Sequence, residues 1–122
     1  MRLLLDTHVA LWAIADSPRL TLKVRDLIAD QANTVFVSAA SLWEIAIKHA
    51  LAKGRANDMP LSATQAHAYF EGAGFASLPI TAAHAMAVSD LPARHADPFD
   101  RMLVAQAMTE PLKLITHDPI VA

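Results

Sequence analysis

The hydrophobic residues of this chain form short continuous runs that alternate with segments of helical periodicity. The runs RLLLD (2–6) and TVFVS (34–38) are apolar or β-branched throughout, which is typical of strands buried on both faces of a sheet. FASLPI (75–80) and LKLITHD (112–118) are predicted as two further strands. Between the strands, apolar spacing and helix start and stop signals predict helices at 7–15, 21–31, 41–54, 62–74, 81–92 and 98–109. This alternation predicts an α/β fold with a mainly parallel sheet.

Polar side chains follow three of the predicted strands at the point where each strand ends. Asp6 comes directly after RLLL, Ser38 follows TVFV, and Thr116 and Asp118 follow LKLI. Binding sites of open parallel sheets form beyond the carboxyl ends of the strands. We therefore expect these side chains to meet at one edge of the sheet.

Each acidic residue near this edge also has a purely structural interpretation. Asp6 or Thr7 is suited to cap the helix that follows. Glu44 closes an S-x-x-E capping-box pattern and stands four residues before Lys48, as in an ion pair on a solvated helix face. Asp118 precedes a proline, as in many turns that follow strands.

The helix that contains Glu44 has an apolar stripe at helical spacing. Glu44 and Lys48 share the side opposite this stripe. The stripe consists of Trp43, Ala46, Ile47, Ala50 and Leu51. Leu11, Trp12 and Trp43 give short helices more large apolar side chains than a small core needs, so we expect part of this surface to be covered by a segment of another protein or by a second subunit.

The stretch HADPFDR (95–101) predicts a helix start with two aspartates, of which capping requires only one. Pro98 suits the first helical position and Asp97 the N-cap before it. Asp100 is then the third helical residue, which capping does not require, and the helix N-terminus favours its charged form. Arg101 lies four residues after Asp97 and can either pair with it or face a substrate.

Composition allows one compact domain, 1–122, and decides little about function. The chain has 122 residues, of which 54% are hydrophobic, and no apolar run approaches the length of a bilayer-spanning helix. It contains no cysteine, which excludes thiolate metal sites and fits a cytoplasmic protein. The formal net charge of −2 argues only weakly against a nucleic-acid partner, because several of the acids are expected at one site.

Oxygen ligands without thiolates or spaced histidines suit hard cations such as Mg²⁺ or Mn²⁺. Clustered carboxylates repel one another unless a cation neutralises them or they bind protons. A bound divalent cation would lower the pKa of a water molecule and bind phosphate oxygens. The chemistry indicated is the hydrolysis of a phosphodiester. No glycine-rich nucleotide-binding motif is present.

Four stretches resemble the acidic motifs of the PIN domain, and more narrowly those of VapC toxins of type II toxin–antitoxin systems. They are LLLDTHVALWAIA, VSAASLWEIAIKHALAKG, DPFDRMLVAQA and LITHD, and together they cover nearly the whole chain. The resemblance implies a three-layer α/β/α sandwich around a mainly parallel sheet. It also implies a Mg²⁺- or Mn²⁺-dependent endoribonuclease, a homodimer, and a cognate antitoxin protein as partner, so that an antitoxin segment or a second subunit would cover the apolar helix surface. The chain stops soon after the last motif, where relatives add a further short strand.

Transferred onto this sequence, the resemblance assigns catalysis and metal binding to four acids. These are Asp6, Glu44, Asp100 and Asp118, with Thr7, Ser38, Thr116, Asp97 and Arg101 in supporting roles. A catalytically inactive PIN-like scaffold that acts by binding a partner is the main alternative. A phosphatase or phosphoacceptor receiver is a weaker one, because no lysine follows a strand in the manner such proteins need. The RNA target is not encoded in any motif.

Overall fold

The computed structural model describes residues 1–52, 59–92 and 97–117. Its strands are β1 (Arg2–Leu5), β2 (Thr34–Ser38), β3 (Ala76–Leu78) and β4 (Lys113–Ile115). Its α-helices are α1 (Thr7–Ala15), α2 (Leu22–Ala29), α3 (Ala39–Ala52), α4 (Ala63–Gly72), α5 (Ala82–Ala87) and α6 (Pro98–Thr109), and a 3₁₀ turn, η1 (Val88–Asp90), follows α5. The predicted order of strands and helices is confirmed, while Asp118 lies outside the described residues.

Several helix ends differ from the predicted ones, and two of the differences have a clear local cause. The helix expected at 81–92 ends as η1, because Pro92 disfavours helical geometry at Leu91, which is extended. The helix expected from residue 41 begins at Ala39. Ser38 accepts a hydrogen bond from the backbone N–H of Ala40 at 2.9 Å, so the start of α3 lies beside the end of β2.

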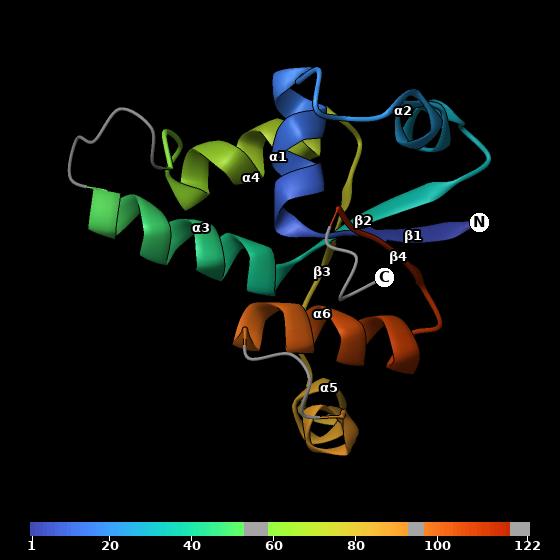
Figure 1. Ribbon diagram of the computed structural model, residues 1–122, viewed down its shortest axis with the longest axis vertical. Coiled ribbons are helices and arrows are strands. Elements are labelled where there is room, and N and C mark those ends of the chain that lie inside the picture. The colour runs from blue at the N-terminus through green and yellow to red at the C-terminus, as the bar shows by residue number, and fades with distance from the viewer. Residues whose placement is uncertain (53–58, 93–96, 118–122) are drawn as a thin grey trace.

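The four strands form one parallel sheet in the order β3-β2-β1-β4. Helices α1, α2 and α4 lie on one side of this sheet and α5 and α6 on the other, while α3 extends from the carboxyl end of β2 (Figure 1). The predicted three-layer α/β/α sandwich is confirmed. No helix within the described ranges is long and apolar enough to cross a bilayer.

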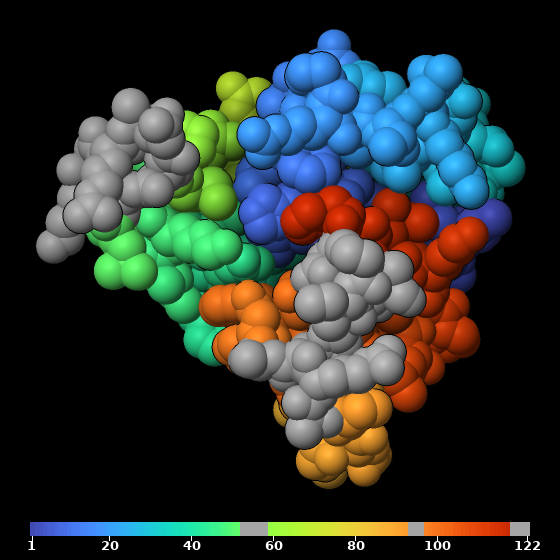
Figure 2. Space-filling view, viewed as in Figure 1, coloured from blue at the N-terminus to red at the C-terminus, as the bar shows by residue number. Residues whose placement is uncertain are grey.

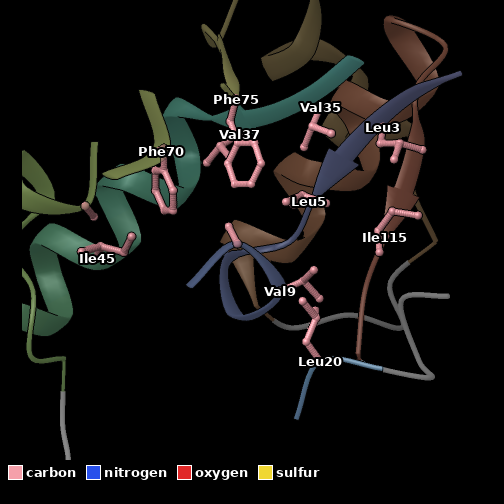
Figure 3. Close-up of a cluster of buried hydrophobic side chains, with 12 residues drawn as sticks. Leu3, Leu5, Val9, Leu20, Val35, Val37, Ile45, Phe70, Phe75 and Ile115 are labelled. Carbon is pink, nitrogen blue, oxygen red and sulfur yellow. The ribbon is translucent and has the colours of Figure 1, made fainter. Parts of the chain in front are cut away.

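Central strand β1 divides its side chains between two hydrophobic cores, as a strand with a two-residue period must. Leu3 and Leu5 face the α1 side, where the larger core is drawn in Figure 3. Leu4 faces the opposite core. All three leucines have no exposed surface, and burying each contributes about 1.5–3 kcal/mol. The two cores therefore fix where β1 ends, and with it the position of Asp6, the next residue.

A buried polar cluster lies between α5 and α6. The His84 side chain is completely buried, and its Nδ1 accepts a hydrogen bond from the backbone N–H of Thr81 at 3.0 Å. Its other ring nitrogen, Nε2, therefore carries the proton and donates to Glu110 Oε2 at 2.6 Å. Gln106 donates from Nε2 to the Pro79 carbonyl oxygen at 3.3 Å. These contacts join the start of α5 to the end of α6.

Candidate active site

Asp6 lies where β1 ends and α1 begins, and it connects three parts of the chain. Its backbone N–H donates to the Ile115 carbonyl oxygen at 2.9 Å, which continues the pairing of β1 with β4. Carboxylate atom Oδ1 accepts from the Val9 backbone N–H at 2.8 Å and so caps α1. The other oxygen, Oδ2, accepts from the Thr116 hydroxyl at 2.6 Å and lies 3.0 Å from Nδ1 of His117. Asp6 thus caps α1 and also lies at the carboxyl edge of the sheet, where the sequence placed it.

Glu44 meets Thr7 beside this edge of the sheet. The Glu44 side chain is buried, and its Oε1 accepts from the Thr7 hydroxyl at 2.7 Å. The hydroxyl oxygens of Thr7 and Ser41 lie 2.9 Å apart. Oε2 of Glu44 accepts from Lys48 Nζ at 2.6 Å. The i,i+4 pair with Lys48 is confirmed, but the expected solvated position of Glu44 is wrong, and so is the capping box, since α3 begins before Ser41.

The two faces of α3 are oriented opposite to those of an ordinary amphipathic helix, whose apolar face is buried. The apolar stripe points outward, and Trp43 and Leu51 are 59% and 67% exposed. The opposite side carries Glu44 into the interior. Helical periodicity shows that a face exists, but not whether it contacts the sheet or another molecule. Trp43 therefore lies outside the core, and its coverage by a partner stays a prediction.

The start of α6 follows the sequence prediction. Asp97 is the N-cap, and its Oδ1 accepts from the backbone N–H groups of Phe99 and Asp100 at 2.8 and 3.2 Å. Pro98 is the first helical residue, so Asp100 is the third. Arg101 donates to the carbonyl oxygens of Val88 and Pro92, which holds the end of η1 against α6.

Ring contacts place the start of α6 beside α3. The rings of Trp43 and Phe99 meet edge to face, with centroids 5.1 Å apart. Glu44 and Asp100 are the next residues along their helices. In Figure 2, the segments that carry α1, α3, α6 and β4 meet on one face of the molecule.

A second ring group lies beside Asp6. The His117 ring centroid is 4.6 Å from that of His8 and 5.1 Å from that of Trp12. Burial among these neighbours and the positive charge of protonated His117 lower the pKa of His8, and the negative charge of Asp6 partly offsets them. The neutral imidazole is thus favoured at His8.

His117 is a contact of Asp6 that the sequence prediction missed. Ligand spacing along one helix does not reveal it, because His117 reaches Asp6 from a neighbouring strand end, 111 residues away. For Lys48, the sequence predicted the pair with Glu44 but not the burial of the Glu44 carboxylate. The position of His117 immediately after the Thr116 strand end was a signal that could have found it.

The donor chemistry of this edge fits a hard divalent cation. Asp6 and Glu44 are buried carboxylates, and the hydroxyls of Thr7 and Thr116 bind them. Within residues 1–52, 59–92 and 97–117, no three histidine or acidic side chains are close enough to form a complete metal-binding group. Asp6 and Glu44 are two of the four acids predicted to bind the metal, and another of the four, Asp118, lies outside the described residues.

Comparison with known proteins extends these observations to the whole chain. The PIN domain family model matches residues 3–122. Among solved structures, the crystal structure of VapBC2 from Rickettsia felis bound to a DNA fragment from their promoter matches with a TM-score of 0.66 and 16% identity, covering 97% of this chain and 88% of that chain. No curated protein matches. PIN domains are generally nucleases. The family match over nearly the full length, together with the parallel sheet and the acids at its carboxyl edge, shows that the chain belongs to the PIN domain family.

Proposed function

We propose that this protein is a Mg²⁺- or Mn²⁺-dependent endoribonuclease, the VapC-type toxin of a type II toxin–antitoxin module. The observation that carries the proposal is the pair of buried carboxylates, Asp6 and Glu44, at the carboxyl edge of a PIN-family sheet. Burial of two acids costs free energy unless hydrogen bonds and positive charge offset it. A site with this cost fits a cation-binding role better than a stabilising one.

Asp6 and Glu44 would hold the ion together with Asp100 and Asp118. The bound cation would supply a water molecule of lowered pKa and positive charge beside the scissile phosphate. Thr116 and Thr7 hold the two buried carboxylates in fixed orientations through their hydroxyl groups. Asp97 supports the site indirectly, because its cap fixes the first turn of α6, which carries Asp100.

Rings near the acids, of which those of His8, Trp43 and His117 are exposed, favour a single-stranded RNA substrate. His8 and His117 lie next to Asp6, and Trp43 and Phe99 adjoin Glu44 and Asp100. Proteins recognise unpaired bases largely by stacking them on aromatic side chains. Rings in these positions are suited to hold bases on either side of a phosphate at the acids.

The exposed stripe of α3 supports a protein partner. Its large apolar residues form a continuous surface on a helix of 14 residues. We propose that an antitoxin segment or a second copy of the chain covers it, and the similar VapBC2 structure agrees with an antitoxin. Co-expression with the protein encoded by the adjacent gene, followed by size-exclusion chromatography, tests this. A protein that stays monomeric and never co-purifies with that neighbour contradicts it.

Metal-dependent cleavage is the direct test of function. Purified protein, stripped of metal and checked by elemental analysis, should cleave single-stranded RNA only after Mg²⁺ or Mn²⁺ is added. EDTA should abolish cleavage, and excess Mn²⁺ should restore it. Full cleavage in chelator by metal-free protein would overturn the mechanism. Mn²⁺ binding without cleavage of any RNA would favour the inactive scaffold instead.

A further inference from the structure

The ion pair between Lys48 and Glu44 combines a fixed partner with a movable one. The Glu44 side chain is 6% exposed, and the Thr7 hydroxyl holds its Oε1 at 2.7 Å. The Lys48 side chain is 47% exposed and reaches Oε2 across one turn of α3. Its ammonium group can therefore leave for water by rotating its own flexible side chain, whereas the carboxylate cannot follow it.

Lys48 supplies the positive charge that the buried Glu44 carboxylate needs. A buried carboxylate without a cation is strongly disfavoured, and a contact of 2.6 Å with an ammonium group offsets part of this cost. Asp6 is satisfied differently, by the Thr116 hydroxyl and by contacts from His117. Glu44 therefore differs from Asp6 in its positive partner: Thr7 binds its Oε1, and Lys48 binds its Oε2.

We propose that Lys48 is an internal competitor of the metal ion, holding Glu44 Oε2 until a divalent cation displaces it. The inference rests on the proposed function, since it takes Glu44 as a metal ligand. The Lys48 ammonium group and a divalent metal ion would compete for the same carboxylate oxygen. Their positive charges repel each other, which opposes binding both at close range. Lys48 therefore lowers the affinity of the site for the metal, while keeping the metal-free fold stable.

The test is the affinity for Mn²⁺, measured by isothermal titration calorimetry on the full chain without RNA. Lys48→Met keeps the aliphatic stem and removes the charge, so it should bind Mn²⁺ about threefold to tenfold more tightly, as expected for removal of a half-exposed ion pair. Lys23→Met makes the same charge change at an exposed position on α2 and should stay within about twofold of the wild type. Lys48→Arg, which keeps the charge, should also stay near the wild-type affinity.

A second comparison separates competition at Glu44 from a general charge effect. In a Glu44→Gln background, Lys48→Met should no longer tighten Mn²⁺ binding, because the contested carboxylate is gone. Lys48→Gln replaces Lys48→Met if circular dichroism shows that the methionine variant is unfolded. If the wild type binds Mn²⁺ and neither neutral variant binds it more tightly, the competition is overturned while the proposed function stands. If neither the wild type nor any variant binds Mn²⁺, both proposals fall.

Discussion

The acid cluster around Asp6 and Glu44 and the cluster around His84 are both buried and both polar, yet their surroundings differ. At His84, one ring nitrogen accepts from the Thr81 backbone within the cap of α5, and the other contacts Glu110 at the end of α6, in the same layer. Asp6 and Glu44 instead have half-exposed basic neighbours, His117 and Lys48. Burial alone thus does not mark a functional group. Buried acids with partners that can move into water fit the proposed cation site better than a purely structural cluster does.

Of the variants considered, Asp6→Asn should have the largest effect on cleavage, since it removes one negative charge from the acid cluster and keeps the shape of the side chain. Asparagine also caps helices, so the free energy of unfolding should change by less than about 1 kcal/mol. Cleavage should fall on the order of 10²-fold or more, as for loss of one strong electrostatic contact in an active site. Single-turnover RNA cleavage and urea unfolding measure the two quantities. An active Asp6→Asn protein would remove Asp6 from the mechanism.

Asp100 and Asp97 show whether the acid cluster extends to α6. Asp100→Asn should retain the fold and lose nearly all cleavage. Asp97→Asn, a good N-cap, should keep stability and much of the activity, whereas Asp97→Ala should cost about 1 kcal/mol of unfolding free energy. Reversed activities for the two asparagine variants, or Mn²⁺ bound to Asp97 and not Asp100 in a crystal, would contradict this assignment.

His84→Ala tests the other cluster, where we expect stability to fall and chemistry to persist. The variant leaves a cavity and removes the partners of the Thr81 N–H and of Glu110, so unfolding free energy should drop by about 2–4 kcal/mol. Cleavage per folded molecule should be unchanged. His67→Ala, at a more exposed i,i+4 pair with Glu71, is the matched control and should change stability by less than about 0.5 kcal/mol. Loss of cleavage at full stability would show that the His84 cluster also serves the site.

The smallest expected effect is the titration of His8, which reports the charges around the acid cluster. Its NMR midpoint should lie below the usual value of 6.5. Because the unfolded chain then binds more protons than the folded one, His8 makes stability rise with pH across the interval between its two pKa values. His117→Gln should raise the His8 midpoint, since burial beside His117 and the charge of His117 both lower it. His67→Gln should leave it unchanged, and an unshifted midpoint in both variants would exclude the His8–His117 interaction.

The sequence predicted the fold well because burial on both faces of a parallel sheet leaves continuous apolar runs. Leu3, Leu4 and Leu5 face two different cores and are all buried, so they form such a run. Asp6 was predicted for a related reason: it follows the strand directly. Asp97 and Pro98 carry a local capping signal that needs no tertiary contact, and the structure confirms it.

The rest depended on contacts between distant segments. The orientation of α3 was unpredictable from periodicity, since Trp43 and Glu44 each define a coherent helix face. The start of α3 was misplaced because Ser41 and Glu44 match a capping box, while Thr7 in another helix binds both side chains. His117 was missed because its partner Asp6 is distant in sequence. The metal-binding roles of Asp6, Glu44, Asp100 and Asp118 stay predictions.

The pairing of β1 with β4 has a consequence for the order in which the protein is made. Asp6 leaves the ribosome well before Thr116 and His117, which bind its carboxylate and lie 110 and 111 residues later in the chain. Contacts between such distant residues form only after the intervening chain is available, and they slow folding. The nascent chain therefore cannot complete the surroundings of Asp6 until Thr116 and His117 have been made. Synthesis itself delays assembly of the site until that point.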